Sequence, residues 1–182
     1  MDIAVYGLIG YEKALLVYEE NRAFLEERFP AFWIRDFLAK REEIPDCDGL
    51  FTRGQGLAVA IREGGLYGAL WQMCEVLGTG CEIDIKKVPL LQEVVEISEC
   101  FGLDPYEVPS HGAFVVAGED LAGKGIDGMY VIGCTKEAKE RVLLLGWDEK
   151  KKERRRRYLT PLKRQKKDMA EQSAATGKNK ER

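Results

Sequence analysis

The chain has 182 residues, 45% of them hydrophobic and 32% charged, which suits one well-buried domain and excludes disorder throughout. Residues 150–182 carry 14 Lys and Arg against 4 Asp and Glu, whereas residues 1–149 carry 14 against 27, so a basic end of charge +10 follows an acidic body of charge −13. The body should repel nucleic acid, while the basic end could attract it or fold back onto the body.

The cysteines and the first residues of the chain indicate the cellular compartment in which the protein is expected. The five cysteines, an odd number at irregular spacing, do not suggest a disulfide framework, and with one histidine in the chain no zinc spacing emerges. The apolar start lacks a basic segment and is interrupted by Glu12 and Lys13, so we expect neither a signal peptide nor a membrane span. The sequence therefore predicts a cytoplasmic protein without a metal site, whose cysteines are small buried apolar residues.

The first third of the chain predicts one strand and two helices. The apolar run at 3–9 is typical of a short buried strand, and the helical period of apolar residues predicts a helix over 11–28 that Pro30 ends. A shorter helix is expected over 32–40. Residues 45–56 are rich in turn formers and predict a loop or irregular link.

The middle of the chain predicts two pairs of a strand and a helix. The continuous apolar run at 57–61 predicts a strand, and the helical face that begins at Leu66 ends at Gly78. Residues 82–85 alternate as a strand does. The next helix has Pro89 in its expected first turn and stops at Gly102.

The last part predicts a group of strands and a tail. Apolar runs at 113–117, 129–133 and 142–145 indicate three strands, and RRRRYLT (154–160) is typical of an exposed edge strand protected by charge. Together the elements predict an α+β fold with a mixed β-sheet and helices packed on it. We expect one domain over residues 1–162 and a basic, disordered tail over residues 163–182.

The clearest candidate for chemistry is the glycine pair Gly64 and Gly65, which stands between a strand and a helix. A helix N-terminus offers unpaired N–H groups, and glycine lets an anion approach them closely. The pair follows Gly54 and Gly56 at a spacing that matches neither the dinucleotide fingerprint nor the P-loop. Composition alone therefore favours a tight strand-to-helix turn over a phosphate cradle.

Other residues give weaker signals. Ser110 and His111 are neighbours that point to opposite faces of an extended chain, so they cannot form a nucleophile–base pair, and no catalytic set emerges. The basic run at 150–157 could bind RNA, a phosphorylated partner or a membrane surface. Because no aromatic residue interrupts it before Tyr158, a charged edge hairpin with a solvated tail is favoured over single-stranded nucleic acid binding.

One long stretch is distinctive as a whole. Residues 63–117 read EGGLYGALWQMCEVLGTGCEIDIKKVPLLQEVVEISECFGLDPYEVPSHGAFVVA, with the ordered motifs E-G-G-L, G-x-G-x-E-I-D, V-P-L, E-x-F-G-L-D-P-Y and S-x-G. This stretch resembles the C-terminal domain of the aminoimidazole ribonucleotide (AIR) synthetase, or PurM, superfamily, and within it the HypE-like hydrogenase expression or formation factors. The likeness extends more weakly over most of the folded chain, and it implies a PurM C-terminal domain-like fold.

The resemblance also carries departures. Family members normally have an N-terminal domain that dimerises and holds metal and ATP, and the chain is expected to lack that half because Met1 falls near the domain start. Val59 and Ala60 stand where the family usually has His-Asp, and the chain ends in KNKER where HypE factors end in a cysteine. The stretch between Ala117 and Met129 is too short for the helix that the family places there.

By resemblance, the family's cleft-facing loops correspond to two segments of this chain, and the candidate ligand-binding residues are Glu63, Gly64, Gly65, Ser110 and Gly112. The main hypothesis is a non-catalytic or partner-dependent module related to hydrogenase maturation factors. It needs no cofactor in isolation and meets ATP and Mg²⁺ only if an N-terminal-type AIR synthase-related protein or a second copy completes the site.

Two alternatives stay open beside the main hypothesis. One is a small anionic-ligand binding protein that uses the Gly64–Gly65 loop. The other is a nucleic-acid-associated adaptor that works through the basic tail, although nucleic acid is an unlikely partner for the acidic body. Gly64→Asp would disturb the first, and deletion from Lys163 onward would disturb the second.

Overall fold

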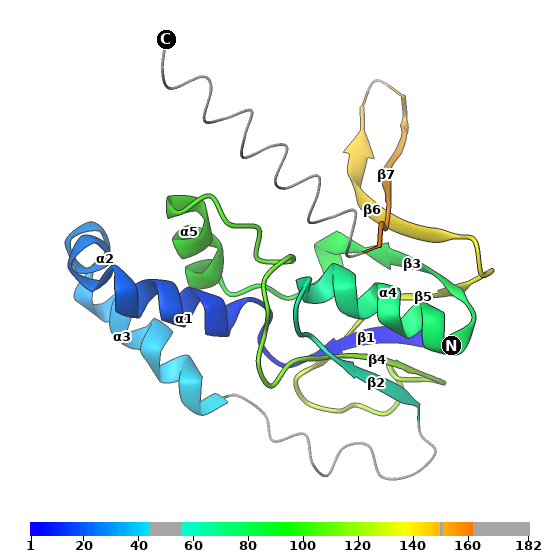
Figure 1. Cartoon of the computed structure of the whole chain (residues 1–182), viewed down its shortest axis with the longest axis horizontal. Coiled ribbons are helices and arrows are strands. Elements are labelled where there is room, and N and C mark those ends of the chain that lie inside the picture. The colour runs from blue at the N-terminus through cyan, green and yellow to red at the C-terminus, as the bar shows by residue number, and fades with distance from the viewer. Residues whose placement is uncertain (44–55, 150, 162–182) are drawn as a thin grey trace.

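A computed structural model describes residues 1–43, 56–149 and 151–161 of the chain. Its centre is a seven-stranded sheet with the strand order β2-β4-β1-β5-β3-β6-β7 (Figure 1). Neighbouring strands are antiparallel except β3 and β6, which are parallel. The predicted α+β fold with a mixed sheet is therefore confirmed.

Each strand overlaps a segment that the sequence predicted as a strand, although the bounds differ by a few residues. They are β1 (Asp2–Tyr6), β2 (Leu57–Ala60), β3 (Gly80–Asp84), β4 (Phe114–Gly118), β5 (Met129–Lys136), β6 (Arg141–Asp148) and β7 (Glu153–Tyr158). The arginine-rich strand β7 lies at the outer edge of the sheet and all six of its residues are exposed, which confirms the predicted charged edge strand. No helix interrupts the segment between β4 and β5, as its length predicted.

The helices required two corrections to the sequence prediction. They are α1 (Tyr11–Glu20), α2 (Arg22–Arg28), α3 (Ala31–Ala39), α4 (Gly65–Leu77) and α5 (Gln92–Cys100), with short 3-10 turns η1 (Lys40–Glu43) and η2 (Ile85–Lys87). The single helix expected over 11–28 is divided at Asn21, whose side-chain amide donates to the Val17 carbonyl at 2.9 Å. The Asn21 N–H donates to the same carbonyl at 3.0 Å, and the break lies in the Asn21 backbone, which has φ −124° and ψ 30°.

The second correction concerns Pro89. The sequence placed it in the first turn of the fourth predicted helix, but α5 begins only at Gln92 because Leu91 is still extended, with φ −67° and ψ 137°. The end of that helix was predicted well, since Gly102 has φ +64° directly after it. The loop predicted at 45–56 and the tail predicted over 163–182 fall on residues outside the described ranges, except for Gly56.

The main core lies between the sheet and α4, which crosses one face of the sheet in Figure 1. The helix buries Leu66, Leu70 and Met73 completely against Ile3 and Ile83 of the central strands. Each such side chain contributes about 1.5–3 kcal/mol to folding through burial. The core therefore fixes the beginning of α4, where the glycine pair lies, relative to the sheet.

A second lobe is built from α1, α2, α3 and α5, which gather beside the sheet in Figure 1. Its core is aromatic: the rings of Tyr11 and Tyr18 lie 5.2 and 6.0 Å from that of Phe37. The Tyr11 hydroxyl donates to the Phe37 carbonyl at 2.9 Å, so the buried polar group is satisfied. This bond ties α1 to the end of α3.

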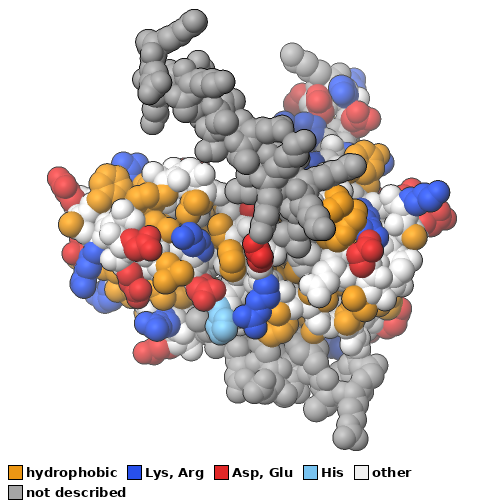
Figure 2. Space-filling model, in the orientation of Figure 1, with side chains coloured by type: hydrophobic (Ala, Val, Ile, Leu, Met, Phe, Trp, Pro, Cys, Tyr) orange, Lys and Arg blue, Asp and Glu red, His pale blue; other side chains and the backbone are white. Residues whose placement is uncertain are grey.

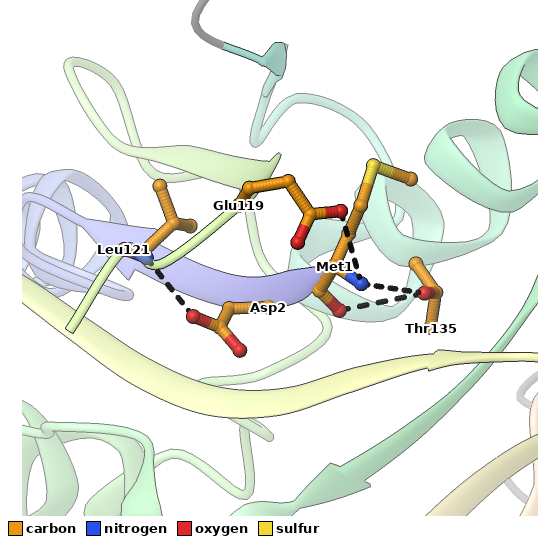
Figure 3. Close-up of polar contacts among 5 residues, drawn as sticks. All are labelled: Met1, Asp2, Glu119, Leu121 and Thr135. Atoms are coloured by element: carbon orange, nitrogen blue, oxygen red, sulfur yellow. Dashed lines mark hydrogen bonds and ion pairs between the residues drawn. The ribbon is translucent and has the colours of Figure 1, made fainter. Parts of the chain in front are cut away.

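The opposite face of the sheet is covered in part by the segment between β4 and β5. Leu121 packs there against Ala4, Tyr6 and Val116. Figure 3 shows how this segment is held: Asp2 accepts a hydrogen bond from the Leu121 N–H at 2.9 Å, and the Met1 carbonyl accepts from the Thr135 hydroxyl at 3.4 Å. The first strand is thus fastened on both sides at its beginning.

Candidate functional site

The glycine pair forms the turn that starts α4. Gly64 is the residue before the helix, with φ +86° and ψ +2°, and Gly65 is its first residue, with φ +61°. Both conformations belong to the left-handed region that residues with a side chain rarely adopt. The turn therefore requires glycine at both positions, whatever else the loop does.

The backbone donors of this turn are committed within the protein. The N–H of Gly65 donates to the Arg62 carbonyl at 2.9 Å, and the N–H of Leu66 donates to the Tyr106 carbonyl at 2.8 Å. A side chain at Gly65 would collide with the Tyr106 carbonyl oxygen and with the backbone of Glu107. The pair thus allows the start of α4 to pack closely on the turn at 104–107, and two of the N–H groups that an anion would use already have partners.

The second predicted loop is centred on Ser110, whose side chain is only 1% exposed. Its hydroxyl oxygen accepts a hydrogen bond from the Gly10 N–H at 2.7 Å, and its own N–H donates to the Ile61 carbonyl at 3.0 Å. A side chain on Gly7 would lie 2.7 Å from the Gly112 carbonyl oxygen. Ser110 and Gly112 therefore join the loop after β1 to the loop after β2.

The structure brings the two predicted loops together at one end of the sheet. The backbone bond from Ser110 to Ile61 lies just before the glycine pair, and Glu63 is exposed beside it. His111 is exposed, and its N–H donates to a Glu12 carboxylate oxygen at 3.1 Å, which fits its expected role in supporting the loop. Whether these residues bind a ligand stays a prediction.

Sequence reasoning missed the side chains that surround the start of α4. The rings of Tyr67 and Tyr106 stack with their centres 5.9 Å apart, and the Arg157 guanidinium lies 5.3 Å from the centre of the Tyr67 ring. Arg157 also reaches a Glu107 carboxylate oxygen at 3.5 Å. Only the pairing of β7 with β6 places residue 157 here, so no local pattern could have revealed the contact.

These neighbours create an environment that disfavours a tyrosinate. Burial raises the pKa of the Tyr67 hydroxyl well above its usual range, and the nearby Asp104 carboxylate raises it further. Burial also raises the pKa of Tyr106, with Asp104 again contributing. Both phenols therefore stay neutral at physiological pH, and their rings serve in packing rather than their hydroxyls as bases.

The cysteines behave in two ways. Cys74 on α4 and Cys81 on β3 are fully buried, as predicted, and a hydrogen bond between the two thiols raises the pKa of Cys81, with burial adding to the effect. Cys100 and Cys134 are only partly buried, which corrects the expectation that all the cysteines are core residues. Cys47 lies outside the described residues.

Three cavities lie away from the predicted loops. One of about 470 Å³ opens between α1, α2 and α3, with Tyr18 and Ile34 in its wall. Another of about 580 Å³ lies along the β6–β7 hairpin, lined by Leu145 and Arg155 among others, and the third, of about 340 Å³, lies beside Arg141. The first of these cavities thus lies on the helical lobe, and the other two lie on the side of the sheet that carries the hairpin.

Two searches of the described part of the chain were negative. Within residues 1–43, 56–149 and 151–161, no three His, Cys, Asp or Glu side chains are grouped so that they could hold a metal ion. Over the same ranges, no helix combines the length and the apolar character that crossing a bilayer requires.

Comparison with solved structures identifies the fold. Escherichia coli HypE, a hydrogenase maturation protein, matches with a TM-score of 0.57 and 18% identity over 88% of this chain. Another HypE structure matches with a TM-score of 0.59 and 17% identity over 88%. Thiamine monophosphate kinase (ThiL) from Aquifex aeolicus matches with a TM-score of 0.54 and 17% identity over 78%. The predicted resemblance to a HypE-like, AIR synthase-related domain is therefore confirmed for the fold.

The comparisons also set the extent of the likeness. The chain covers 50% of E. coli HypE and 51% of the Aquifex kinase, so it spans about half the length of these structural neighbours. Scans of the sequence against protein-family models and against curated proteins gave no match.

Proposed function

We propose that this domain is a partner-dependent, non-catalytic module related to the hydrogenase maturation factors. The observation that carries the proposal is its likeness to about half of HypE and about half of ThiL. Structures of those proteins include HypE in complex with ATP and ThiL complexed with AMPPCP and TMP. In the proposal, ATP and Mg²⁺ reach this domain only when a partner supplies the remaining part of the site.

The geometry of the predicted loops supports a scaffolding role. The N–H groups of Gly65 and Leu66 are bonded to carbonyls of the same chain, and the Ser110 hydroxyl is buried in a bond with Gly10. Groups that are already satisfied are poorly placed to hold a triphosphate without rearrangement. Val59 and Ala60 stand where the related family usually has His-Asp, so neither a carboxylate nor an imidazole is present at these two positions.

The partner-facing surface in this proposal consists of the exposed residues on these loops, Arg62, Glu63 and His111. They lie on a base that the sheet and α4 hold rigidly, as a docking surface requires. A solved HypE–HypF complex is a precedent for a protein partner in this fold. The partner proposed here is an N-terminal-type AIR synthase-related protein or a second copy of this chain.

The test is complex formation with a purified N-terminal-type AIR synthase-related protein from the same genome, measured by calorimetry and size exclusion. We expect a stoichiometric complex that Glu63→Lys weakens by roughly tenfold, through a charge reversal at the docking surface. Glu20→Lys makes the same change at an exposed position on α1 and should leave the affinity unaltered. Equal loss with both variants, or no complex and a monomeric parent chain, would contradict the proposal.

A further inference from the structure

The strand β7 presents an open edge at the end of the sheet. Among the described residues it pairs only with β6, and each of its six side chains is exposed. The β6–β7 hairpin projects from the body of the molecule in Figure 1, and Figure 2 shows basic and acidic side chains together on it. An unpaired edge of this kind is a template for a further strand.

The register identifies which backbone groups face outward. The N–H of Leu159 donates to the Arg141 carbonyl at 3.0 Å, and the ladder continues by pairing Tyr158 with Val142. Because bonded and outward positions alternate along an antiparallel strand, the N–H and C=O groups of Arg154, Arg156 and Tyr158 point to the open edge. These three residues are every second residue of β7, so their backbone groups could form the hydrogen bonds of an added strand.

The charge of the strand is only partly neutralised. Arg154 forms an ion pair with Asp84 at 2.8 Å, and Arg157 forms one with Glu107 at 3.5 Å. Within the described residues, Arg155 and Arg156 have no ion-pair partner. Their neighbours in the sequence place them on opposite faces of the sheet, so an incoming strand would meet a positive charge on either face.

A hollow lies along the hairpin that carries this edge. It has a volume of about 580 Å³, and its basic lining residues Lys151, Arg154, Arg155 and Arg156 outnumber the acidic Asp148 and Glu153. We propose that β7 binds an extended acidic peptide segment of another protein, which joins the sheet as a further strand and directs its carboxylates to Arg155 and Arg156. This inference does not rest on the proposed function, because β7 is separate from the loops with Arg62, Glu63 and His111 that form the proposed partner-facing surface.

The observations favour a peptide over a nucleic acid. The feature that distinguishes β7 is its row of open backbone groups, which an extended peptide can pair with and a nucleic acid cannot use in register. The chain up to residue 149 has a charge of −13, which repels a long polyanion but tolerates a short acidic segment at one edge. Charge complementarity at Arg155 and Arg156 then supplies specificity.

The probe is a fluorescent peptide of about eight residues in which pairs of glutamates alternate with pairs of threonines. Carboxylates then point to both faces of the added strand, and threonine favours an extended conformation. Its control is the same peptide with alternate backbone nitrogens methylated, which keeps every charge but blocks strand pairing. We expect the first to bind the full chain and the second to bind at least about tenfold more weakly, through the loss of several backbone hydrogen bonds. Fluorescence anisotropy measures both.

Two substitutions at Arg156 distinguish the contribution of its charge to peptide binding from that of its backbone N–H. Arg156→Ala removes the charge and should weaken peptide binding roughly threefold to fivefold. Arg156→Pro removes the charge and also the outward N–H, without touching the bonds to β6, and should weaken binding at least about fivefold further. Lys124→Ala removes one exposed positive charge in the segment between β4 and β5, as Arg156→Ala does on β7, and serves as the control for net charge.

Amide hydrogen exchange followed by NMR identifies which residues the peptide contacts. It does so even in a variant whose folded state is less stable. Peptide binding should slow exchange at Arg154, Arg156 and Tyr158 and leave Lys124 unchanged. The proposal is overturned by equal affinity for the methylated and unmethylated peptides, by protection elsewhere in the chain only, or by no binding at roughly 50 mM salt, where charge attraction is strong. Tighter binding of a single-stranded RNA of equal charge, with the same protected amides, would also overturn it.

Discussion

The beginning of α4 and the strand β7 differ in whether their backbone N–H and C=O groups have hydrogen-bond partners. At the glycine pair the N–H groups of Gly65 and Leu66 are bonded to carbonyls of the same chain, and a side chain on Gly65 would collide with backbone. Along β7 every residue is exposed and one row of backbone groups has no partner among the described residues. The region whose sequence is typical of a binding loop is closed, whereas the charged run at the edge is open.

This difference distinguishes two physical reasons why glycine can be required at the beginning of a helix. A glycine pair at a helix N-terminus indicates either close approach of an anion or close approach of another part of the chain. Here the turn at 104–107 occupies the place that an anion would take, through the Tyr106 carbonyl. The stability of the closed region should therefore depend strongly on that packing, and the stability of the open region only weakly.

The largest expected effect is that of Gly65→Ala. It combines a strained φ of +61° with a collision against the backbone of Tyr106 and Glu107, so we expect a loss of at least about 3 kcal/mol in the free energy of unfolding. Gly78→Ala has a similar φ of +65° but nothing within 4 Å, and should cost only about 1 kcal/mol. Urea unfolding distinguishes them, and equal losses would show that close packing at Gly65 has no weight.

The next effect is expected at Ser110. Ser110→Ala removes the buried acceptor of the Gly10 N–H and should cost about 1–3 kcal/mol in unfolding free energy. Thr79→Val is the matched control, because the Thr79 hydroxyl is buried and has no hydrogen-bond partner in the described part of the chain. It should leave stability unchanged or raise it slightly. A neutral Ser110→Ala would mean that this bond does not hold the three loops together.

A smaller effect should appear at alkaline pH. The pKa of Tyr67 is raised in the folded protein, mainly by burial, so its contribution is complete below the unfolded pKa of about 10 and is lost as pH rises above that value. The free energy of unfolding should therefore fall above roughly pH 10, by up to about 1.4 kcal/mol per pH unit from this group. Tyr67→Phe should make that fall shallower, and an identical pH profile would refute the assignment.

The smallest effect compares two arginines of β7. Arg157→Ala loses the ion pair with Glu107, whose side chain is 17% exposed, and the contact with the Tyr67 ring, which together should cost about 0.5–1 kcal/mol. Arg155→Ala removes an exposed side chain without an ion pair among the described residues and should change stability by less than about 0.5 kcal/mol. Thermal unfolding of both variants would check whether Arg157 in particular, rather than the positive charge of β7 in general, supports the closed region.

Much of the fold could be predicted because it depends on local patterns. The apolar runs placed the strands, and the left-handed glycine Gly78 marked the end of α4. The break at Asn21 was missed because the backbone leaves helical geometry at that one residue, with φ −124° and ψ 30°, while the apolar period continues through the break.

The candidate site was predictable only as separate loops. Resemblance indicated both segments, but the bond that joins Gly10 to Ser110 links residues 100 positions apart. The contact of Arg157 with Glu107 depends in the same way on strand order, which no local pattern specifies. The N–H group of Leu66 is bonded to the Tyr106 carbonyl only because the two loops pack together in the folded protein. Composition alone therefore could not decide between an anion site and a tight turn.

ATP turnover by the purified chain tests the central claim of a partner-dependent, non-catalytic module most directly. The assay would follow phosphate release with Mg²⁺ present, first with the chain alone and then with the N-terminal-type AIR synthase-related protein added. The account predicts no turnover by the chain alone, and a change in the partner's activity once the complex forms. Robust, Mg²⁺-dependent turnover by the isolated chain, abolished by denaturing it, would contradict the account.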